Sequence, residues 1–202
     1  MPENSASNPE SHPLRPFLPT GAKLLMCGTF PPQKHRWSMN FYYPNFINDM
    51  WRIFGIIYFN DKDALVDAAE KTFRLPLLKA TLEKHGIALS DTGREIVRTT
   101  GNASDKFLDI RKGIDLPAIL AEIPECIAVA TTGEKAAGVI AEMTSTEVPP
   151  IGEWRECELM DSSGTLRKFR HWRMPSSSRA YPLPLAEKAK FYNRMIEALN
   201  LK

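Results

Sequence analysis

The side chains best suited to chemistry are an asparagine, an aspartate and a pair of tyrosines that follow short apolar runs. They are Asn48, Asp91, Tyr42 and Tyr43. A carboxamide has one acceptor oxygen and two N–H donors, so Asn48 can hold the edge of a purine or pyrimidine or orient a water molecule. A carboxylate such as Asp91 can assist that water when its surroundings permit. Together these residue types can bind a flat polar ring and a water molecule if the fold brings them to one place.

Two short strands are expected to position these residues. An apolar run over about Lys23–Cys27 breaks into the rigid turn Gly28–Pro32, and order resumes as a helix from about Phe46. Gly86–Asp91 is predicted to be a second buried strand, which puts Asp91 at its carboxyl end. Binding crevices of open α/β sheets lie at the carboxyl ends of the strands. We therefore expect the turn and Asp91 to face the same crevice.

The helix from about Phe46 is predicted from a single apolar stripe. The residues of the stripe are Ile47, Met50, Trp51, Phe54 and Tyr58, which recur at the spacing of one helix face. Asn45 is expected to be the N-cap, because its side chain can accept hydrogen bonds from the free N–H groups of the first turn. Asn48 would then lie in that first turn, beside the stripe, and face a cleft.

Strand-like and helix-like segments alternate along the rest of the chain. Helices are expected over Asp61–Phe73, Leu75–His85, Leu116–Ile123, the stretch after Gly133, and about Pro184–Leu199. A third strand is expected over Cys126–Ala130, a hairpin over residues 154–174, and a loop over Thr99–Asp105. This alternation predicts an α/β fold in which helices cover both faces of a mostly parallel sheet. Residues 1–20 are proline-rich and are expected to form a flexible tail, and residues 21–202 a single domain.

Composition limits the class of protein. The chain has 202 residues, 43% of them hydrophobic, and a net charge of +2, which is too small by itself to indicate a polyanionic partner. Cys27, Cys126 and Cys157 lie far apart, without the spacing of a disulfide framework or a metal site. The sequence also has no long apolar run and no signal-peptide pattern. We expect a cytoplasmic monomer, not bound to a membrane, without a metal or an organic cofactor.

Two motifs resemble the uracil-DNA glycosylase superfamily. Gly28–Pro32 reads GTFPP, and Tyr42–Trp51 reads YYPNFINDMW. The nearest resemblance is to the hypoxanthine-DNA glycosylase branch, with G-[ST]-F-P-G and Y-Y-A-H-P-R-N-Q-F-W, and the mismatch-specific uracil/thymine DNA glycosylases are related. Asn45 replaces a histidine of that pattern, and Phe30 stands where other branches carry the Asp or Asn that activates water. Thr132 likewise replaces an Asn.

The resemblance implies a three-layer α/β/α sandwich with about four parallel strands. It also implies a monofunctional DNA glycosylase of base-excision repair, in which water hydrolyses the N-glycosidic bond of a flipped, deaminated base such as uracil or hypoxanthine. Asn48 and Asp91 would be catalytic, and DNA with a damaged or mismatched base would be the partner. The expected base-binding residues are Gly28, Thr29, Phe30, Tyr42, Tyr43 and Thr132. The expected DNA-binding residues are Arg173, Ser176, Ser177, Ser178 and Arg179, where Arg179 or Tyr181 would fill the gap left by the flipped nucleotide.

Other interpretations remain open. Phe30 and Thr132 are compatible with a DNA-binding member of the superfamily that has lost hydrolysis. A hydrolase acting on small nucleosides would not need the five basic residues between Thr165 and Tyr181, which could also form an ordinary solvated face. Asn48 could be a helix cap, Asp91 a turn carboxylate, and the two tyrosines core aromatics.

Overall fold

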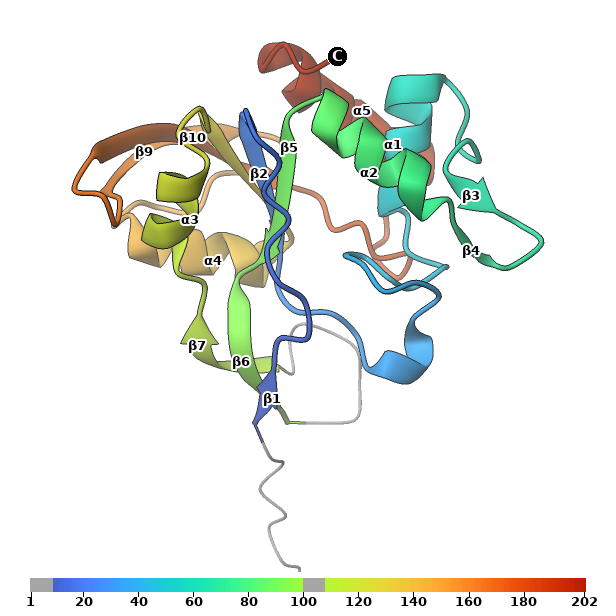
Figure 1. Cartoon of the computed structure of the whole chain (residues 1–202), viewed down its shortest axis with the longest axis horizontal. Coiled ribbons are helices and arrows are strands. Elements are labelled where there is room, and N and C mark those ends of the chain that lie inside the picture. The colour runs from blue at the N-terminus through green and yellow to red at the C-terminus, as the bar shows by residue number, and fades with distance from the viewer. Residues whose placement is uncertain (1–8, 100–107) are drawn as a thin grey trace, which may run out of the picture.

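A computed structural model of the chain describes residues 9–99 and 108–202. Its main sheet has five strands in the order β5-β2-β8-β10-β9 (Figure 1). The strands are β5 (Ile87–Asp91), β2 (Leu24–Gly28), β8 (Ala128–Thr132), β10 (Leu166–Met174) and β9 (Trp154–Met160). The first four are parallel, and β9 pairs antiparallel with β10 at the edge. The expected α/β class with a mostly parallel sheet is confirmed, with five strands in place of about four.

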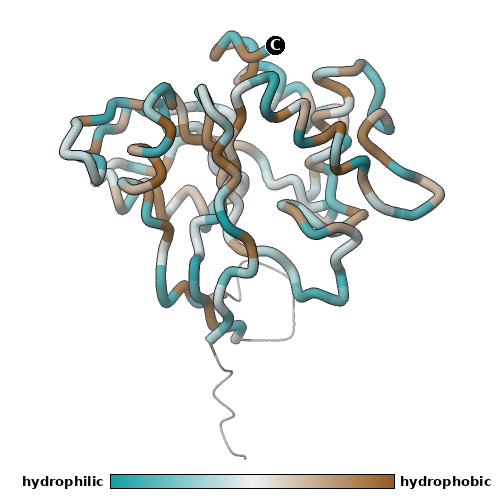
Figure 2. Tube along the Cα trace, viewed as in Figure 1, coloured by the Kyte–Doolittle hydropathy of each residue, from teal (hydrophilic) through white to brown (hydrophobic). Residues whose placement is uncertain are grey.

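Alternate residues of β2 belong to two hydrophobic cores. Leu24 and Met26 belong to one core, and Leu25 and Cys27 to the other, because successive side chains of a strand point to opposite faces. The first core includes residues of α1 (Met50–Phe59), α2 (Leu75–Lys84) and α5 (Leu185–Ala198), and the second includes residues of α3 (Leu116–Glu122) and α4 (Glu134–Met143). Figure 2 shows hydrophobic residues along the central strands. Burial on both faces explains why β2 is apolar without a break.

The helix expected from Phe46 begins later, at Met50, and its N-cap is Asp49 in place of Asn45. Residues before it form turns in which the Asn48 N–H donates to the Asn45 carbonyl at 2.8 Å. Arg52 also donates from Nη1 to the carbonyl of Phe46 at 2.7 Å. The backbone of residues 45–48 therefore has hydrogen-bond partners without being part of the helix. Ile47, expected on the buried stripe, is 56% exposed.

The prediction of a helix over Asp61–Phe73 is wrong. This segment contains a short hairpin of β3 (Val66–Asp67) and β4 (Thr72–Phe73). Asp61 accepts a hydrogen bond from the Asp63 N–H at 2.9 Å, and Asp67 accepts one from the Glu70 N–H at 3.2 Å. Aspartate side chains that bind nearby backbone in this way favour turns over a helix. The other expected strands and helices are present with bounds close to those predicted.

A second sheet, in the order β1-β6-β7, lies below the first and was not expected (Figure 1). Its strands are β1 (Glu10–Ser11), β6 (Gly93–Arg98) and β7 (Leu108–Gly113). Part of the expected N-terminal tail is therefore packed against the domain from residue 9 onward, in contrast with a flexible tail. Residues 1–8 of that tail, and residues 100–105 of the expected loop, lie outside the described residues. None of the described helices has the length and apolar character needed to cross a membrane.

Two helical glycines differ in the space around them and give a matched test of the packing. A Cβ at Gly55 of α1 would lie 2.5 Å from the Asp61 carbonyl oxygen, whereas a Cβ at Gly138 of α4 would meet no atom within 4 Å. We expect Gly55→Ala to lower the free energy of unfolding by about 1–3 kcal/mol through overpacking. Gly138→Ala should raise it by up to about 1 kcal/mol through helix propensity. Urea unfolding of both variants measures this, and equal effects would contradict the packing of α1 against residues 61 and 62.

Candidate functional site

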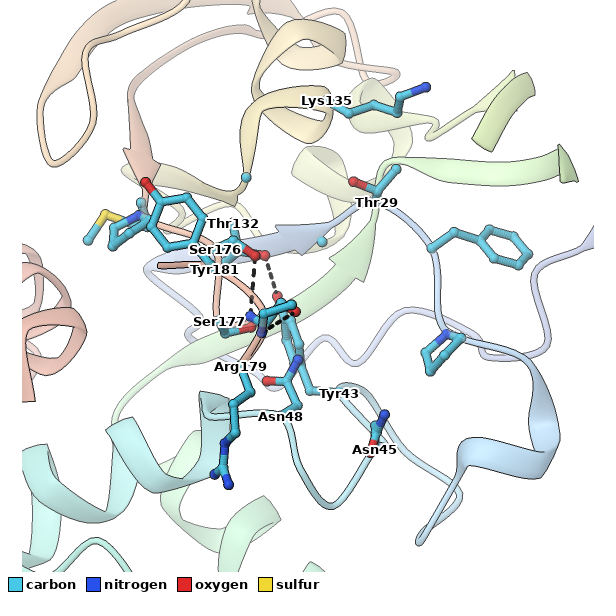
Figure 3. Close-up of a pocket in the computed structure, with 18 of the residues that line it drawn as sticks. Thr29, Tyr43, Asn45, Asn48, Thr132, Lys135, Ser176, Ser177, Arg179 and Tyr181 are labelled. Atoms are coloured by element: carbon cyan, nitrogen blue, oxygen red, sulfur yellow. Dashed lines mark hydrogen bonds between the residues drawn. The ribbon is translucent and has the colours of Figure 1, made fainter. Parts of the chain in front are cut away.

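A cavity of about 1100 Å³ lies at the carboxyl ends of the parallel strands. Most of its lining comes from four parts of the chain, namely the turn after β2, the segment before α1, the start of α4 and the segment after β10 (Figure 3), and Asp91 and Ile151 complete it. Gly28 pairs with Asp91 across β2 and β5, and Thr132 pairs with Met174 across β8 and β10. The parallel register therefore brings residues that are distant in sequence to one edge of the sheet, as expected.

Twelve of the thirteen site residues proposed from the sequence line this cavity. They are Gly28, Thr29, Phe30, Tyr43, Asn48, Asp91, Thr132, Arg173, Ser176, Ser177, Ser178 and Arg179. The exception is Tyr42, which is 2% exposed and donates from Oη to the Arg15 carbonyl at 3.0 Å. Its ring belongs to the hydrophobic core. The expectation that Tyr42 contacts a base is therefore not met by its position.

Tyr43 is held at the cavity by its backbone and by its hydroxyl. Its φ of 48° lies in the left-handed region, which is uncommon for a residue other than glycine. The hydroxyl lies 3.1 Å from Thr132 Oγ1, and the ring packs edge-on against Trp51. Burial raises the pKa of Tyr43, and the nearby Asp91 charge raises it further. The side chain is thus a fixed, neutral aromatic ring.

Asn48 precedes α1, and only the oxygen of its side-chain amide makes a hydrogen bond within the described structure. Its Oδ1 accepts a hydrogen bond from the Met50 N–H at 2.9 Å. Among the residues that the structure describes, none accepts a hydrogen bond from its Nδ2 group. Figure 3 shows Asn48 beside Tyr43 in the cavity. The side chain can therefore donate two hydrogen bonds to a bound molecule while its oxygen stays fixed.

Asp91 lies at the floor of the cavity and is 5% exposed. Its Oδ2 is 2.9 Å from His12 Nε2. A Cβ at Gly28 would lie 2.6 Å from Asp91 Oδ1, closer than such atoms approach one another. Glycine at position 28 is therefore required by the carboxylate on the neighbouring strand. Sequence reasoning placed Asp91 correctly at the end of its strand, but did not identify His12.

Phe30 gives the turn after β2 an aromatic side chain where a carboxylate or a side-chain amide could have contacted water. Its ring packs with Ile96 and Leu108 in a small hydrophobic cluster and lies edge-on to His12 with ring centroids 5.0 Å apart. Phe30 therefore serves as an apolar wall, and the carboxylate of Asp91, which lies against Gly28, also lines the cavity.

The segment Pro175–Arg179 after β10, which we call the serine loop, is held by a buried ion pair. Lys188 of α5 donates from Nζ to Asp49 Oδ2 at 2.9 Å and to the Ser178 carbonyl at 2.7 Å. Arg179 donates from Nη2 to Asp49 Oδ1, also at 2.9 Å. The Asp49 N–H donates to the Ser177 carbonyl at 3.0 Å. Asp49 thus joins the start of α1 to the serine loop.

Neither Asp49 nor Lys188 was identified from the sequence. A signal for Lys188 was present, since it lies on the buried stripe of the last helix, between Leu185 and Tyr192. A lysine on such a stripe is rarely buried unless it is paired. No comparable signal marked Asp49 as its partner.

The basic residues of β10 do not form one surface. Arg167 is buried and donates to the carbonyls of Leu120 and Pro124, the latter at 2.7 Å. Lys168 pairs with Glu158, and the Arg170 guanidinium lies over the Trp154 ring. Only Arg173 and Arg179 of the run line the cavity, joined there by two more cations, Arg36 and Lys135, and by the acidic residues Asp91 and Glu134. The run of five basic residues between Thr165 and Tyr181 therefore brings less positive charge to the cavity than the sequence suggests.

A metal centre has no candidate ligands in the described part of the chain, because no group of three or more His, Cys, Asp or Glu side chains is placed to hold an ion. The three cysteines are free and buried, and burial raises the pKa of Cys27 and of Cys126. These thiols are thus poor nucleophiles.

Comparison with known proteins shows the fold. The sequence matches no protein-family model and no curated protein. The structure is similar to the solution NMR structure of a protein from Methanosarcina acetivorans that bears the name "putative Uracil DNA glycosylase". The two share 16% sequence identity with a TM-score of 0.59, over 94% of this chain and 98% of the other. The mostly parallel sheet and its helices therefore have the fold of that protein.

The ion pair beneath the serine loop gives a test of how this wall is held. Asp49→Ala leaves the buried Lys188 ammonium without its carboxylate, and we expect a loss of about 3–5 kcal/mol in the free energy of unfolding. The matched control is Asp63→Ala, because the exposed Asp63–Lys62 pair should contribute at most about 1 kcal/mol. Urea unfolding measures both. Similar losses for the two variants would show that Asp49 does not support the fold as described.

Proposed function

We propose that this chain is a DNA glycosylase of the uracil-DNA glycosylase superfamily, closest to the hypoxanthine-DNA glycosylase branch. It would hydrolyse the N-glycosidic bond of a deaminated base that has been flipped out of DNA, without a metal or an organic cofactor. The observation that carries the proposal is the meeting of Tyr43, Asn48 and Asp91 in one cavity bordered by the serine loop. The fold shared with the Methanosarcina protein supports it, as do the two sequence motifs.

The cavity suits a single planar base. A base leaving the duplex loses a few kcal/mol of stacking and pairing, and stacking on an aromatic ring returns about 1–3 kcal/mol. Tyr43 supplies such a ring. Uracil, hypoxanthine and xanthine carry a carbonyl where the parent base has an amino group, and a carbonyl accepts hydrogen bonds from the Asn48 Nδ2 group. An amino group at that position would face two donors, so Asn48 favours the deaminated base.

The chemistry assigned to Asp91 is activation of water. The water oxygen bonds to C1′ of the sugar as the C1′–N bond breaks, and the electron pair of that bond leaves with the base. Asp91 accepts the proton that the water loses, and a proton from solvent later neutralises the base. Asn48 donors become more favourable as negative charge develops on the base carbonyl, which lowers the barrier. This assignment places the general base at the end of β5, since Phe30 cannot act as one.

The serine loop and the arginines are assigned to the DNA backbone. Serine hydroxyls, backbone N–H groups and guanidinium groups all bind phosphate oxygens. Ser176, Ser178 and Arg173 line the cavity, and Arg179 can contact phosphate on its exposed side while Asp49 fixes its position. Tyr181 is left as the candidate to fill the gap in the duplex. We further propose a monomer with a single domain that includes the segment from Glu10 onward, the three-layer arrangement of this superfamily, and action on DNA inside the cell.

A DNA-binding protein without hydrolysis is the second candidate. Phe30 favours it, because the turn after β2 lacks the Asp or Asn of other branches. The hydroxyl of Thr132 also lies within hydrogen-bond distance of Tyr43, so it has less capacity to contact a base. Binding of oligonucleotides without an abasic product would identify this candidate.

Excision by variants of Asn48 tests the proposal. We expect the protein to release uracil, hypoxanthine or xanthine from oligonucleotides, detected as alkali-labile sites. Asn48→Asp retains an acceptor for the Met50 N–H but loses both donors, so excision should fall about 100- to 1000-fold while the fold is kept.

The control is Asn45→Asp, which makes the same charge change at another residue that lines the cavity. Asn45 Oδ1 also accepts a backbone hydrogen bond, from Ile47, so the two variants preserve similar local structure. Excision should remain close to that of the wild type in Asn45→Asp. Equal losses in both variants would remove the specific role of Asn48, and no excision of any base by the wild type would contradict the proposed activity.

A further inference from the structure

The segment Glu10–Phe17, which we call the N-terminal strap, reaches the candidate site from outside the main sheet. Glu10 pairs with Arg98, whose Nη2 donates to the Pro31 carbonyl at 2.8 Å. Phe17 exchanges two backbone hydrogen bonds with Leu89, each of 2.9 Å. The strap is therefore tied to the turn after β2 at one end and to β5 at the other.

His12 lies between these two anchors and points into the protein. Its side chain is 0% exposed, and its Nε2 is 2.9 Å from Asp91 Oδ2. The Phe30 ring lies edge-on to the imidazole, and the Tyr42 ring is stacked at a centroid distance of 6.1 Å. The imidazole is therefore packed between two aromatic rings, which restrict its orientation.

The other imidazole nitrogen can be satisfied in either charge state. The Leu14 N–H lies 3.1 Å from His12 Nδ1 and can donate to it, while the Leu14 carbonyl oxygen, at 2.9 Å, can accept from it. A neutral ring accepts at Nδ1 and keeps its proton on Nε2, whereas a protonated ring donates at both nitrogens. In both states the Nε2–H group can donate to Asp91.

We propose that His12 is a positioning residue for Asp91. It binds Oδ2 and leaves Oδ1 against Gly28 at the cavity floor, where the carboxylate can orient and deprotonate the attacking water. This inference rests on the proposed function, and it adds to it a residue from the N-terminal strap that touches neither base nor water. A histidine that orients a carboxylate by one hydrogen bond fixes geometry that water activation requires.

The charged groups around the strap are consistent with this role. Arg94 of β6 donates from Nη2 to the Leu14 carbonyl at 3.1 Å, and Glu10 is engaged by Arg98. The strap is thus fixed by one ion pair, by the Arg94 hydrogen bond and by backbone hydrogen bonds, none of which involves the imidazole. A change at His12 should therefore leave the strap attached.

The test compares excision by His12→Ala and His12→Gln. Glutamine can present an N–H donor near the position of Nε2, whereas alanine cannot. We expect His12→Ala to lower kcat about 10- to 100-fold with little change in KM, because DNA contacts are unaltered, and His12→Gln to recover most of the loss. In an Asp91→Asn background, His12→Ala should cause little further loss, since residues that act through one another are not additive.

The outcomes separate the two proposals. An active wild type with an equally active His12→Ala, or a His12→Gln as impaired as His12→Ala, would overturn the role of His12 and leave the proposed function intact. A wild type that excises no base would overturn the proposed function. Thermal unfolding of each variant, with His35→Ala as an exposed histidine control, detects any loss caused by unfolding. A soluble, folded His12→Ala with the predicted fall in kcat supports the positioning role.

Discussion

The parallel pairing of β5, β2, β8 and β10 is the constraint on which the site depends. Pairing places Gly28 opposite Asp91, and the carboxylate then occupies the space that a side chain at position 28 would need. The same pairing brings Thr132 beside the end of β10, from which the serine loop starts. A shift of β2 by one residue would put its whole alternate set of side chains on the wrong face.

Two buried carboxylates attach the remaining parts of the chain to this edge. The carboxylate of Asp49 joins the start of α1 to Lys188 and to the serine loop, and the carboxylate of Asp91 meets His12 of the strap. In each case an acidic residue near the cavity receives a basic partner from a segment distant in sequence. Because a buried carboxylate without a partner is costly, each contact holds its two segments in one arrangement.

The sequence was sufficient to predict the strand ends and most of the cavity wall, because apolar runs that stop at Gly28 and Asp91 reveal where parallel strands end. It could not decide between Tyr42 and Tyr43, since adjacent residues of the same type differ only in backbone conformation, and the left-handed φ of Tyr43 has no signal in composition. The strap was also missed, because a proline-rich segment that gains its order from contacts with β5 and β6 has the composition of a flexible tail. The helix expected over residues 61–73 failed for a different reason, because Asp61 and Asp67 bind nearby backbone N–H groups and so favour turns.

The proposed function requires that this cavity hold a single base turned out of DNA. The most direct measurement is a two-dimensional NMR titration with a duplex containing 2′-fluoro-2′-deoxyinosine, an analogue whose glycosidic bond resists hydrolysis. We expect large shifts of the Asn48 side-chain amide and of the Tyr43 backbone signal with this duplex, and none with a matched duplex containing deoxyadenosine. Shifts confined to residues outside the cavity, or identical shifts with both duplexes, would contradict it.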